Sequence, residues 1–291
     1  MDKIFAGTGV ALATPFKQDF SIDNDKIEIL VNYVIENGID YIVALGTTAE
    51  TPALSFVERK QVLDVVIESV KGRVPVVAGI GGNNTMEVNE QIHLFDLSKV
   101  SAVLSVTPYY NRPQQRGLIA HFEEIAKQSP LPVILYNVPS RTGINIEAAT
   151  TLEIAKKIPK VIGIKEASGN FAQIMNIIQN KPKDFLVISG DDAITLPLIA
   201  CGADGVISVV ANAFPKDFSE MVRLALNGNY SQARESHYKL LSRISACFQD
   251  GSPSGVKAFL QEKGLIEDYV RLPLVPVNEQ TKILIRELSN S

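Results

Sequence analysis

The sequence has no tryptophan, only two cysteines and three histidines, and no long uninterrupted apolar run. Cys201 and Cys247 are far apart and fit no metal spacing, so two buried free thiols are expected. His93, His121 and His237 are scattered, and none has a second potential ligand four residues away. No apolar run reaches the roughly 18 residues of a membrane helix. The sequence therefore predicts neither a metal site nor a membrane partner.

The chain also lacks an excess of basic residues, with 28 Lys and Arg against 32 Asp and Glu and a net charge of -4. Nucleic-acid binding needs clustered basic residues, so no nucleic-acid partner is expected. The first apolar stretch, Ile4–Val10, is short and contains Gly7, Thr8 and Gly9, unlike a signal peptide. We therefore expect a cytoplasmic protein whose first strand lies there.

Short apolar runs, most of them rich in Val and Ile, alternate with helical patterns. The eight runs are Gly9–Thr14, Tyr41–Leu45, Val74–Ile80, Ala102–Thr107, Val133–Asn137, Val161–Lys165, Phe185–Ser189 and Gly205–Val210. Such runs are typical of parallel strands buried on both faces. Helical spacing predicts the helices Asp23–Asn37, Glu58–Val70, Phe171–Gln179 and Pro215–Leu226. Eight strand–helix units predict an α/β fold, the (β/α)₈ TIM barrel.

A doubly wound open sheet is the competing architecture, and it usually binds its ligand on a glycine-rich first turn. No GxGxxG or GxxxxGK[ST] pattern is present, and Gly79–Gly82 has neither spacing. After Gly228 the strand pattern stops, and three further helices are expected at Tyr230–Phe248, Gly255–Glu262 and Glu279–Leu288. We therefore divide the chain into a catalytic barrel, residues 1–228, and a C-terminal helical extension, residues 229–291.

Lys165 is the most informative residue, because it ends an apolar, β-branched run. Val161, Gly163 and Lys165 alternate along the run and are expected on one face of the strand. Burial disfavours the charged form of an amine, and a neutral amine attacks carbonyl groups to form Schiff bases. The alternative is a lysine that snorkels at a strand end or pairs with a buried carboxylate. Lys257 also has apolar neighbours, and we expect it to project from an amphipathic helix.

The active site of a barrel lies at the carboxyl ends of its strands, so the polar segments after the predicted strands are candidates. These segments are Gly46–Thr51, Thr107–Pro113, Tyr136–Gly143, Lys165 and Ser189–Asp192. Each segment alone has an alternative explanation as turn chemistry. Their convergence on one rim indicates a site.

Together these groups suit an α-keto acid that is held as an imine and converted to an enamine. The phenol of Tyr136 can shuttle a proton, and Thr47 and Tyr110 can extend a hydroxyl relay. Arg141 can bind a carboxylate through its planar fork, and the backbone amides of Gly46–Thr48 can bind another. The set does not suit phosphoryl transfer, hydride transfer or metal-assisted hydrolysis.

Six motifs, in order along the chain and each near a predicted strand end, carry a resemblance. They are Gly46–Glu50, Val106–Asn111, Leu135–Gly143, Gly163–Ala167, Ser189–Asp192 and Gly205–Ser208. With them and the tail Leu272–Leu274, the chain resembles the dihydrodipicolinate synthase family of the pyruvate-dependent class I aldolases (the N-acetylneuraminate lyase-like superfamily). The resemblance covers almost the whole chain.

The resemblance implies a lyase that condenses pyruvate with L-aspartate 4-semialdehyde through a lysine Schiff base. Its product, 4-hydroxy-tetrahydrodipicolinate, belongs to diaminopimelate and lysine biosynthesis. No cofactor is implied, and the family is usually a homotetramer built as a dimer of dimers. An alternative is another pyruvate-imine lyase, such as N-acetylneuraminate lyase or a keto-deoxy-sugar-acid aldolase, but those enzymes usually lack the arginine of Ser140–Gly143. A non-catalytic barrel is a third possibility, and the intact set of candidate catalytic residues argues against it.

The resemblance also assigns roles to individual residues. It implies Lys165 as the Schiff-base nucleophile, Tyr136, Thr47 and Tyr110 as the proton relay, Thr47 and Thr48 as pyruvate carboxylate contacts, Arg141 as the semialdehyde carboxylate contact, and Gly190 and Ile207 as backbone positions that line the pocket. Tyr110 is expected to reach the active site of a neighbouring subunit.

Two departures from the family pattern concern a glycine and the regulatory site. Ala49 replaces the usual glycine after Gly-Thr-Thr, and we expect this to be tolerated if its φ is negative. The polar positions of a lysine-regulatory site are matched by Thr51, Asn83, Glu87 and Tyr109. Phe56 and Arg59 replace histidines of some lysine-sensitive members, so weak or absent lysine inhibition is expected.

Overall fold

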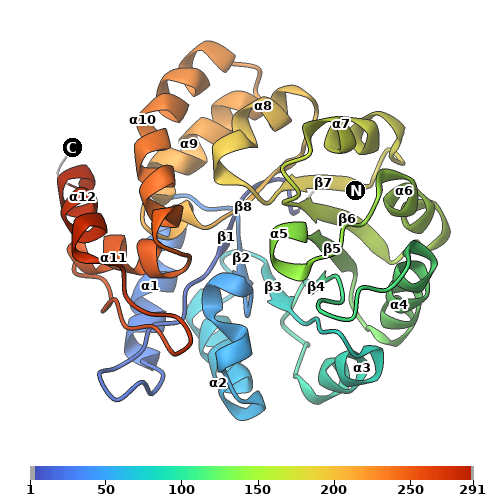
Figure 1. Cartoon of the computed structure of the whole chain (residues 1–291), viewed down its shortest axis with the longest axis horizontal. Helices are drawn as coiled ribbons and strands as arrows, with labels where there is room; N and C mark the ends of the chain where they lie inside the picture. Colours follow the sequence, from blue (N-terminus) through green and yellow to red (C-terminus); the bar gives the residue numbers. More distant parts are fainter. Residues whose placement is uncertain (1–3, 290–291) are drawn as a thin grey trace.

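Eight parallel strands form a closed barrel in the centre of the molecule (Figure 1). The computed structural model of the chain describes residues 4–289, and its strands pair in sequence order, with β8 closing on β1. The strands are β1 (Gly7–Ala11), β2 (Tyr41–Ala44), β3 (Val76–Gly79), β4 (Ala102–Val106), β5 (Val133–Asn137), β6 (Val161–Glu166), β7 (Leu186–Ser189) and β8 (Gly205–Ser208). The predicted (β/α)₈ TIM barrel is confirmed.

Helices surround the barrel (Figure 1). They are α1 (Asn24–Glu36), α2 (Phe56–Val70), α3 (Thr85–Leu94), α4 (Gln115–Gln128), α5 (Pro139–Thr142), α6 (Ala148–Lys157), α7 (Phe171–Asn180), α8 (Thr195–Ala200) and α9 (Pro215–Leu226), with the short 3₁₀ helices η1 (Thr47–Ala49), η2 (Thr51–Ala53), η3 (Asp192–Ile194) and η4 (Val210–Asn212). α2 begins two residues before the predicted Glu58, because Ser55 and Glu58 form a reciprocal capping box.

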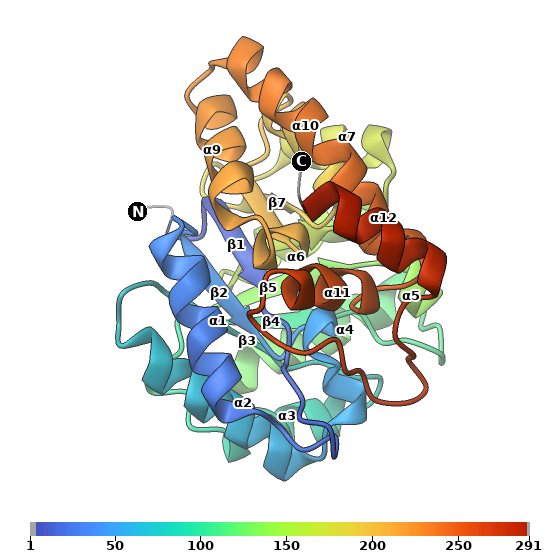
Figure 2. The ribbon, with the colours of Figure 1, turned by 90° about the vertical axis from the view of Figure 1, so that its left-hand side faces the viewer.

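The described chain after Gly228 contains three helices and no strand, with an irregular segment, residues 263–278, between the last two helices. The helices are α10 (Tyr230–Gln249), α11 (Ser254–Glu262) and α12 (Glu279–Ser289). α10 packs on α9, and α11 and α12 pack on each other along one side of the barrel (Figure 2). These helices follow the predicted positions to within one residue at each end.

The first strand lies two residues earlier than predicted. β1 begins at Gly7 rather than Gly9, and the chain leaves the sheet before Thr14. The N–H of Leu12 still donates to the carbonyl of Val43 at 3.0 Å, but that of Ala13 donates to the side chain of Asn212 at 3.0 Å. At Ala13, the side chain of Asn212, which follows β8 in the chain, therefore takes the place of a backbone acceptor on β2.

A β-bulge near the start of β6 corrects the predicted alternation. Val133 pairs with Val161, whereas Ile134 pairs with Gly163, so Ile162 is an extra residue. Val161 consequently packs in the core between the strands and the helices, and Ile162 packs against the core inside the barrel. The prediction that Val161 shares a face with Lys165 was wrong. Alternation resumes at Gly163, which leaves Lys165 facing inward.

The two thiols differ in exposure. Cys247 is buried on α10, and burial raises its pKa well above the usual value. Cys201 is exposed, because it caps the carboxyl end of α8 at the outer surface. The expectation of a buried thiol was therefore wrong for Cys201.

His121 on α4 is a buried histidine outside the barrel mouth. Its ring is 5% exposed, its Nδ1 lies 2.8 Å from Oγ1 of Thr85, and burial lowers its pKa from 6.5 to about 4. Between these two pH values the unfolded chain binds a proton that the folded chain does not. Stability is therefore lost as the pH falls from 6.5 to about 4, by up to about 3 kcal/mol.

Replacing His121 with glutamine is expected to remove this part of the acid sensitivity. Glutamine retains a hydrogen-bonding end near Thr85 and does not titrate. The measurement is the thermal midpoint of both proteins from pH 7 to pH 4. The variant should lose less stability over this interval, and parallel curves for the two proteins would contradict the assignment.

Candidate active site

Lys165 presents its amine at the mouth of the barrel, over the ring of Tyr136. Its side chain is 5% exposed, and in the sheet it lies between Tyr136 on β5 and Ile188 on β7. Nζ lies 4.3 Å from the centroid of the Tyr136 ring. Within residues 4–289 it forms no hydrogen bond or ion pair. The amine is thus largely shielded from solvent and free to react with a ligand.

Gly190, which follows β7, leaves space for the lysine stem. A Cβ at this position would lie 3.0 Å from Cε of Lys165 and 2.7 Å from Cβ of Ala167. Any larger residue would therefore push on the nucleophile candidate. The predicted role of Gly190 as a lining position has a steric reason.

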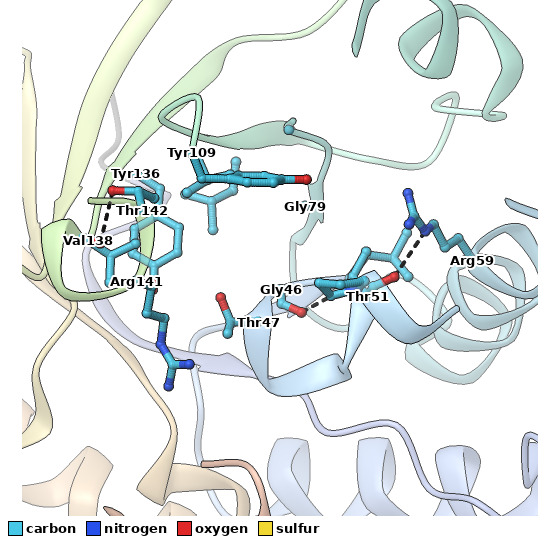
Figure 3. A pocket seen from close by; sticks show the side chains of 15 residues that line it. Gly46, Thr47, Thr51, Arg59, Gly79, Tyr109, Tyr136, Val138, Arg141 and Thr142 are labelled. Carbon is cyan, nitrogen blue, oxygen red and sulfur yellow. Dashed lines mark hydrogen bonds between the residues drawn. The ribbon is translucent and has the colours of Figure 1, made fainter. Parts of the chain in front are cut away.

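Two adjoining cavities meet at this mouth. A cavity of about 230 Å³ is lined by most of the predicted catalytic and binding residues, namely Thr47, Thr48, Tyr136, Arg141, Lys165 and Gly190. A second cavity, of about 330 Å³, shares Thr47, Tyr136 and Arg141 and extends to Tyr109 (Figure 3). Val138 also lines both cavities, so the two spaces adjoin along these four residues.

Arg141 supplies a free positive charge at this junction. It lies on α5, a single helical turn directly after β5, and its guanidinium makes no hydrogen bond or ion pair with the described part of the chain. The guanidinium points away from Tyr136 in Figure 3. An exposed, unpaired guanidinium beside two cavities is suited to a carboxylate.

Thr47 and Thr48 lie on η1, directly after β2. The left-handed backbone conformations of this segment fall on Leu45 (φ 57°) and Glu50 (φ 55°), and Ala49 is not among them. The condition for tolerating alanine in place of glycine is therefore met. Both threonines on this short helix line the smaller cavity.

Two of the predicted site residues lie outside both cavities. Tyr110 has φ 73° and is 90% exposed, so the chain does not bring it into its own active site. Ile207 is buried in the core inside the barrel. The fold gathers the other predicted catalytic and substrate-binding residues in one place.

The positions matched to a lysine-regulatory site are only partly gathered. Thr51 and Tyr109 line the larger cavity, whereas Asn83 and Glu87 do not. Arg59 lines the same cavity and donates from Nε to the carbonyl of Thr51 at 3.1 Å. A fixed cation therefore lies beside the threonine (Figure 3).

A polar network behind Lys165 was not predicted. Glu166 is fully buried and accepts hydrogen bonds from Asn137 at 3.0 Å and from Gln173 at 3.3 Å. Burial raises its pKa. The network joins the ends of β5 and β6, the two strands that carry Tyr136 and Lys165. The adjacent charged residues Lys165 and Glu166 at the end of the predicted strand could have indicated this network.

The predicted position of Lys257, projecting from an amphipathic helix, was wrong. The side chain is completely buried, with Nζ 2.5 Å from Oε1 of Glu50. α11 is buried on every side from Ser254 to Leu260.

Residues 4–289 contain no group of three or more His, Cys, Asp or Glu side chains that could hold a metal ion. Over the same residues, every helix is too short or too polar to cross a membrane.

Comparisons with known proteins agree along the whole described chain. The model of the dihydrodipicolinate synthetase family matches residues 4–289. The chain is 55% identical over 275 residues to the 4-hydroxy-tetrahydrodipicolinate synthase of Flavobacterium psychrophilum, covering 94% of each protein. It is 51% identical to that of Parabacteroides distasonis over 282 residues, covering 97% of this chain and 95% of the relative. A chloride-inhibited dihydrodipicolinate synthase from Acinetobacter baumannii, solved in complex with pyruvate, has a TM-score of 0.95, with 39% identity and 98% coverage of both chains.

Proposed function

Because the chain belongs to the dihydrodipicolinate synthetase family, we propose a catalytic role for each residue at the mouth of its barrel. The enzyme is of the class I aldolase type and condenses pyruvate with L-aspartate 4-semialdehyde to give 4-hydroxy-tetrahydrodipicolinate, in lysine and diaminopimelate biosynthesis. The unpaired amine of Lys165, 4.3 Å from the Tyr136 ring, is the observation that carries the proposal.

In the proposed mechanism, the amine of Lys165 attacks the keto carbon of pyruvate, and loss of water leaves an imine. Thr47 and Thr48 hold the pyruvate carboxylate. Loss of a methyl proton converts the imine to an enamine, whose carbon attacks the aldehyde of the second substrate. Tyr136, with Thr47 and the Tyr110 of a neighbouring subunit, moves the protons.

Arg141 binds the carboxylate of aspartate semialdehyde in this proposal, while Gly190 leaves room for the stem of Lys165 in the pocket. The arginine also distinguishes the reaction from that of the sugar-acid lyases, which bind a polyol at this loop. After the condensation, the amino group that came from the semialdehyde attacks the imine carbon, closes the ring and displaces the amine of Lys165, which is then free again.

Turnover of pyruvate with aspartate semialdehyde, coupled to NADPH oxidation by a reductase that consumes the product, tests the function. Rapid turnover that depends on both substrates is the expected result. Trapping of a pyruvate imine without turnover would keep Lys165 as nucleophile and assign the chain to another lyase of the superfamily.

The proposal includes a homotetramer, a dimer of dimers, in the cytoplasm, with residues 1–228 as the catalytic barrel and residues 229–291 as its extension. Tyr110 supports the dimer, because a phenol that is 90% exposed at the rim of its own barrel is available to a neighbouring subunit. Sedimentation velocity of the enzyme checks the assembly.

L-Lysine is expected to inhibit the enzyme weakly or not at all. The cavity beside Thr51 holds the guanidinium of Arg59, which repels a ligand ammonium group, and Phe56 packs on Phe95 with ring centroids 5.1 Å apart. The measurement is an inhibition curve with lysine, compared with that of Arg59→His, which should be more sensitive. Complete inhibition of the unmodified enzyme at sub-millimolar lysine would contradict this prediction.

A further inference from the structure

A buried ion pair joins the C-terminal extension to the segment that carries Thr47 and Thr48. Glu50 follows these threonines by two residues, and its carboxylate is completely shielded from solvent, as is the ammonium of Lys257 on α11. The two groups are 2.5 Å apart, and Nζ of Lys257 also donates to the carbonyl of Tyr269 at 2.8 Å. The other carboxylate oxygen of Glu50 accepts the backbone N–H of Arg271 at 2.9 Å.

The aromatic ring of Phe16 completes the surroundings of the pair. Nζ of Lys257 lies 4.2 Å from its centroid, and the guanidinium carbon of Arg271 lies 4.6 Å from it. Burial lowers the pKa of Lys257 to about 8, against the opposing effect of Glu50. The extension thus places the amine of Lys257 directly against the carboxylate of Glu50.

Glu50 is connected directly to the carboxylate-binding threonines. Its backbone N–H donates to the carbonyl of Thr47 at 3.0 Å, and its left-handed φ of 55° places it at the junction of η1 and η2. This conformation is unfavourable for an L-residue, and contacts with the surroundings stabilise it. The contacts of the Glu50 carboxylate with α11 and Arg271 supply that restraint.

We propose that Glu50 and Lys257 are positioning residues, through which the C-terminal extension holds Thr47 and Thr48 in the geometry that binds the pyruvate carboxylate. The inference rests on the proposed function of the site. Removing either partner leaves a buried charge without compensation, which favours movement of the segment that carries it. Small displacements of binding groups reduce reactivity strongly, even when the substitution lies away from the chemistry.

The test uses the full-length enzyme and measures the pyruvate concentration that gives half-maximal borohydride-trapped adduct. Glu50→Gln and Lys257→Met are each expected to raise this concentration by about 10-fold or more, with a smaller change in the KM for aspartate semialdehyde. In the double variant, the fold-increase in the half-saturating pyruvate concentration should be far smaller than the product of the two single fold-increases, because the two residues act as one unit.

Glu58→Gln is the matched control. Glu58 pairs with Arg271 on the same tail, with Nη2 2.6 Å from Oε1, but it anchors the tail to α2 rather than to the threonine segment. This variant should lose thermal stability and keep its half-saturation by pyruvate within about twofold. If Glu58→Gln raised the half-saturating pyruvate concentration as much as Lys257→Met does, the effect would reflect a general loss of stability, and the proposal would be overturned.

The double variant still gives a result if a single variant fails to fold. It removes both buried charges, so it should fold even where a single variant fails. If it folds and is half-saturated by the same pyruvate concentration as the unmodified enzyme, the proposal is wrong. The unmodified enzyme tests the proposed function separately. If it traps pyruvate but does not turn over the semialdehyde, the proposed reaction is wrong, and the comparison of half-saturating pyruvate concentrations among the variants still tests the role of Glu50 and Lys257.

Discussion

Lys165→Ala is expected to abolish the borohydride-trapped pyruvate adduct and to reduce turnover by more than about a thousandfold. In the proposed mechanism the amine of Lys165, which lines the cavity, is the nucleophile, and alanine offers no atom that can form an imine. Mass spectrometry of the enzyme after incubation with pyruvate and borohydride detects the adduct directly. Turnover is followed in the coupled assay with the second substrate.

Two further substitutions separate chemistry from packing. Lys165→Met retains most of the volume beside Tyr136 and should be as inactive as the alanine variant while folding normally. Lys160→Ala removes an exposed lysine one residue before β6 and should leave both adduct and turnover unchanged. Persistent trapping in Lys165→Ala would show that another lysine is the nucleophile.

Arg141→Ala is expected to reduce kcat/KM for aspartate semialdehyde by about 10- to 100-fold, as the loss of a charge-assisted hydrogen bond of about 1.5–3 kcal/mol implies. The guanidinium is exposed and bonds to no group in the described chain, so its removal should change the thermal midpoint little. Half-saturation of imine formation by pyruvate should remain within about twofold. The measurements are steady-state kinetics with the semialdehyde varied and adduct trapping with pyruvate varied.

Arg141→Lys refines this prediction. Lysine keeps the positive charge and loses the planar fork, so it should recover part of the lost activity. An equal loss of imine formation and of semialdehyde use in Arg141→Ala would contradict the assigned role. It would place the arginine at the pyruvate carboxylate instead.

The barrel and most of its site followed from local patterns in the sequence. A strand buried on both faces needs a continuous apolar run, and Val133–Asn137 was predicted with its observed ends. Parallel strands bring their carboxyl ends to one rim, which placed Tyr136 beside Lys165 without knowledge of any contact. The predicted alternation of side chains along β6 was wrong at Val161, because a bulge shifts the alternation by one residue.

Errors arose where burial depends on packing between elements. Cys201 has apolar sequence neighbours but lies at a helix end on the outer surface. Lys257 was expected at the surface, because an isolated lysine in a helix is normally solvated. Its burial requires a carboxylate, and no local pattern says where that carboxylate is.

By itself, the sequence determined the class of fold and the gathering of Lys165, Tyr136 and Arg141 at one rim, because continuous apolar runs and strand ends are local properties of the chain. Only the tertiary structure decided which groups hold that site in place. Glu50 and Lys257 are 207 positions apart, and Glu50 and Arg271 are 221 positions apart. Such contacts form only when the barrel closes and the extension packs on it, since burying a charge is tolerated only where the fold supplies its partner.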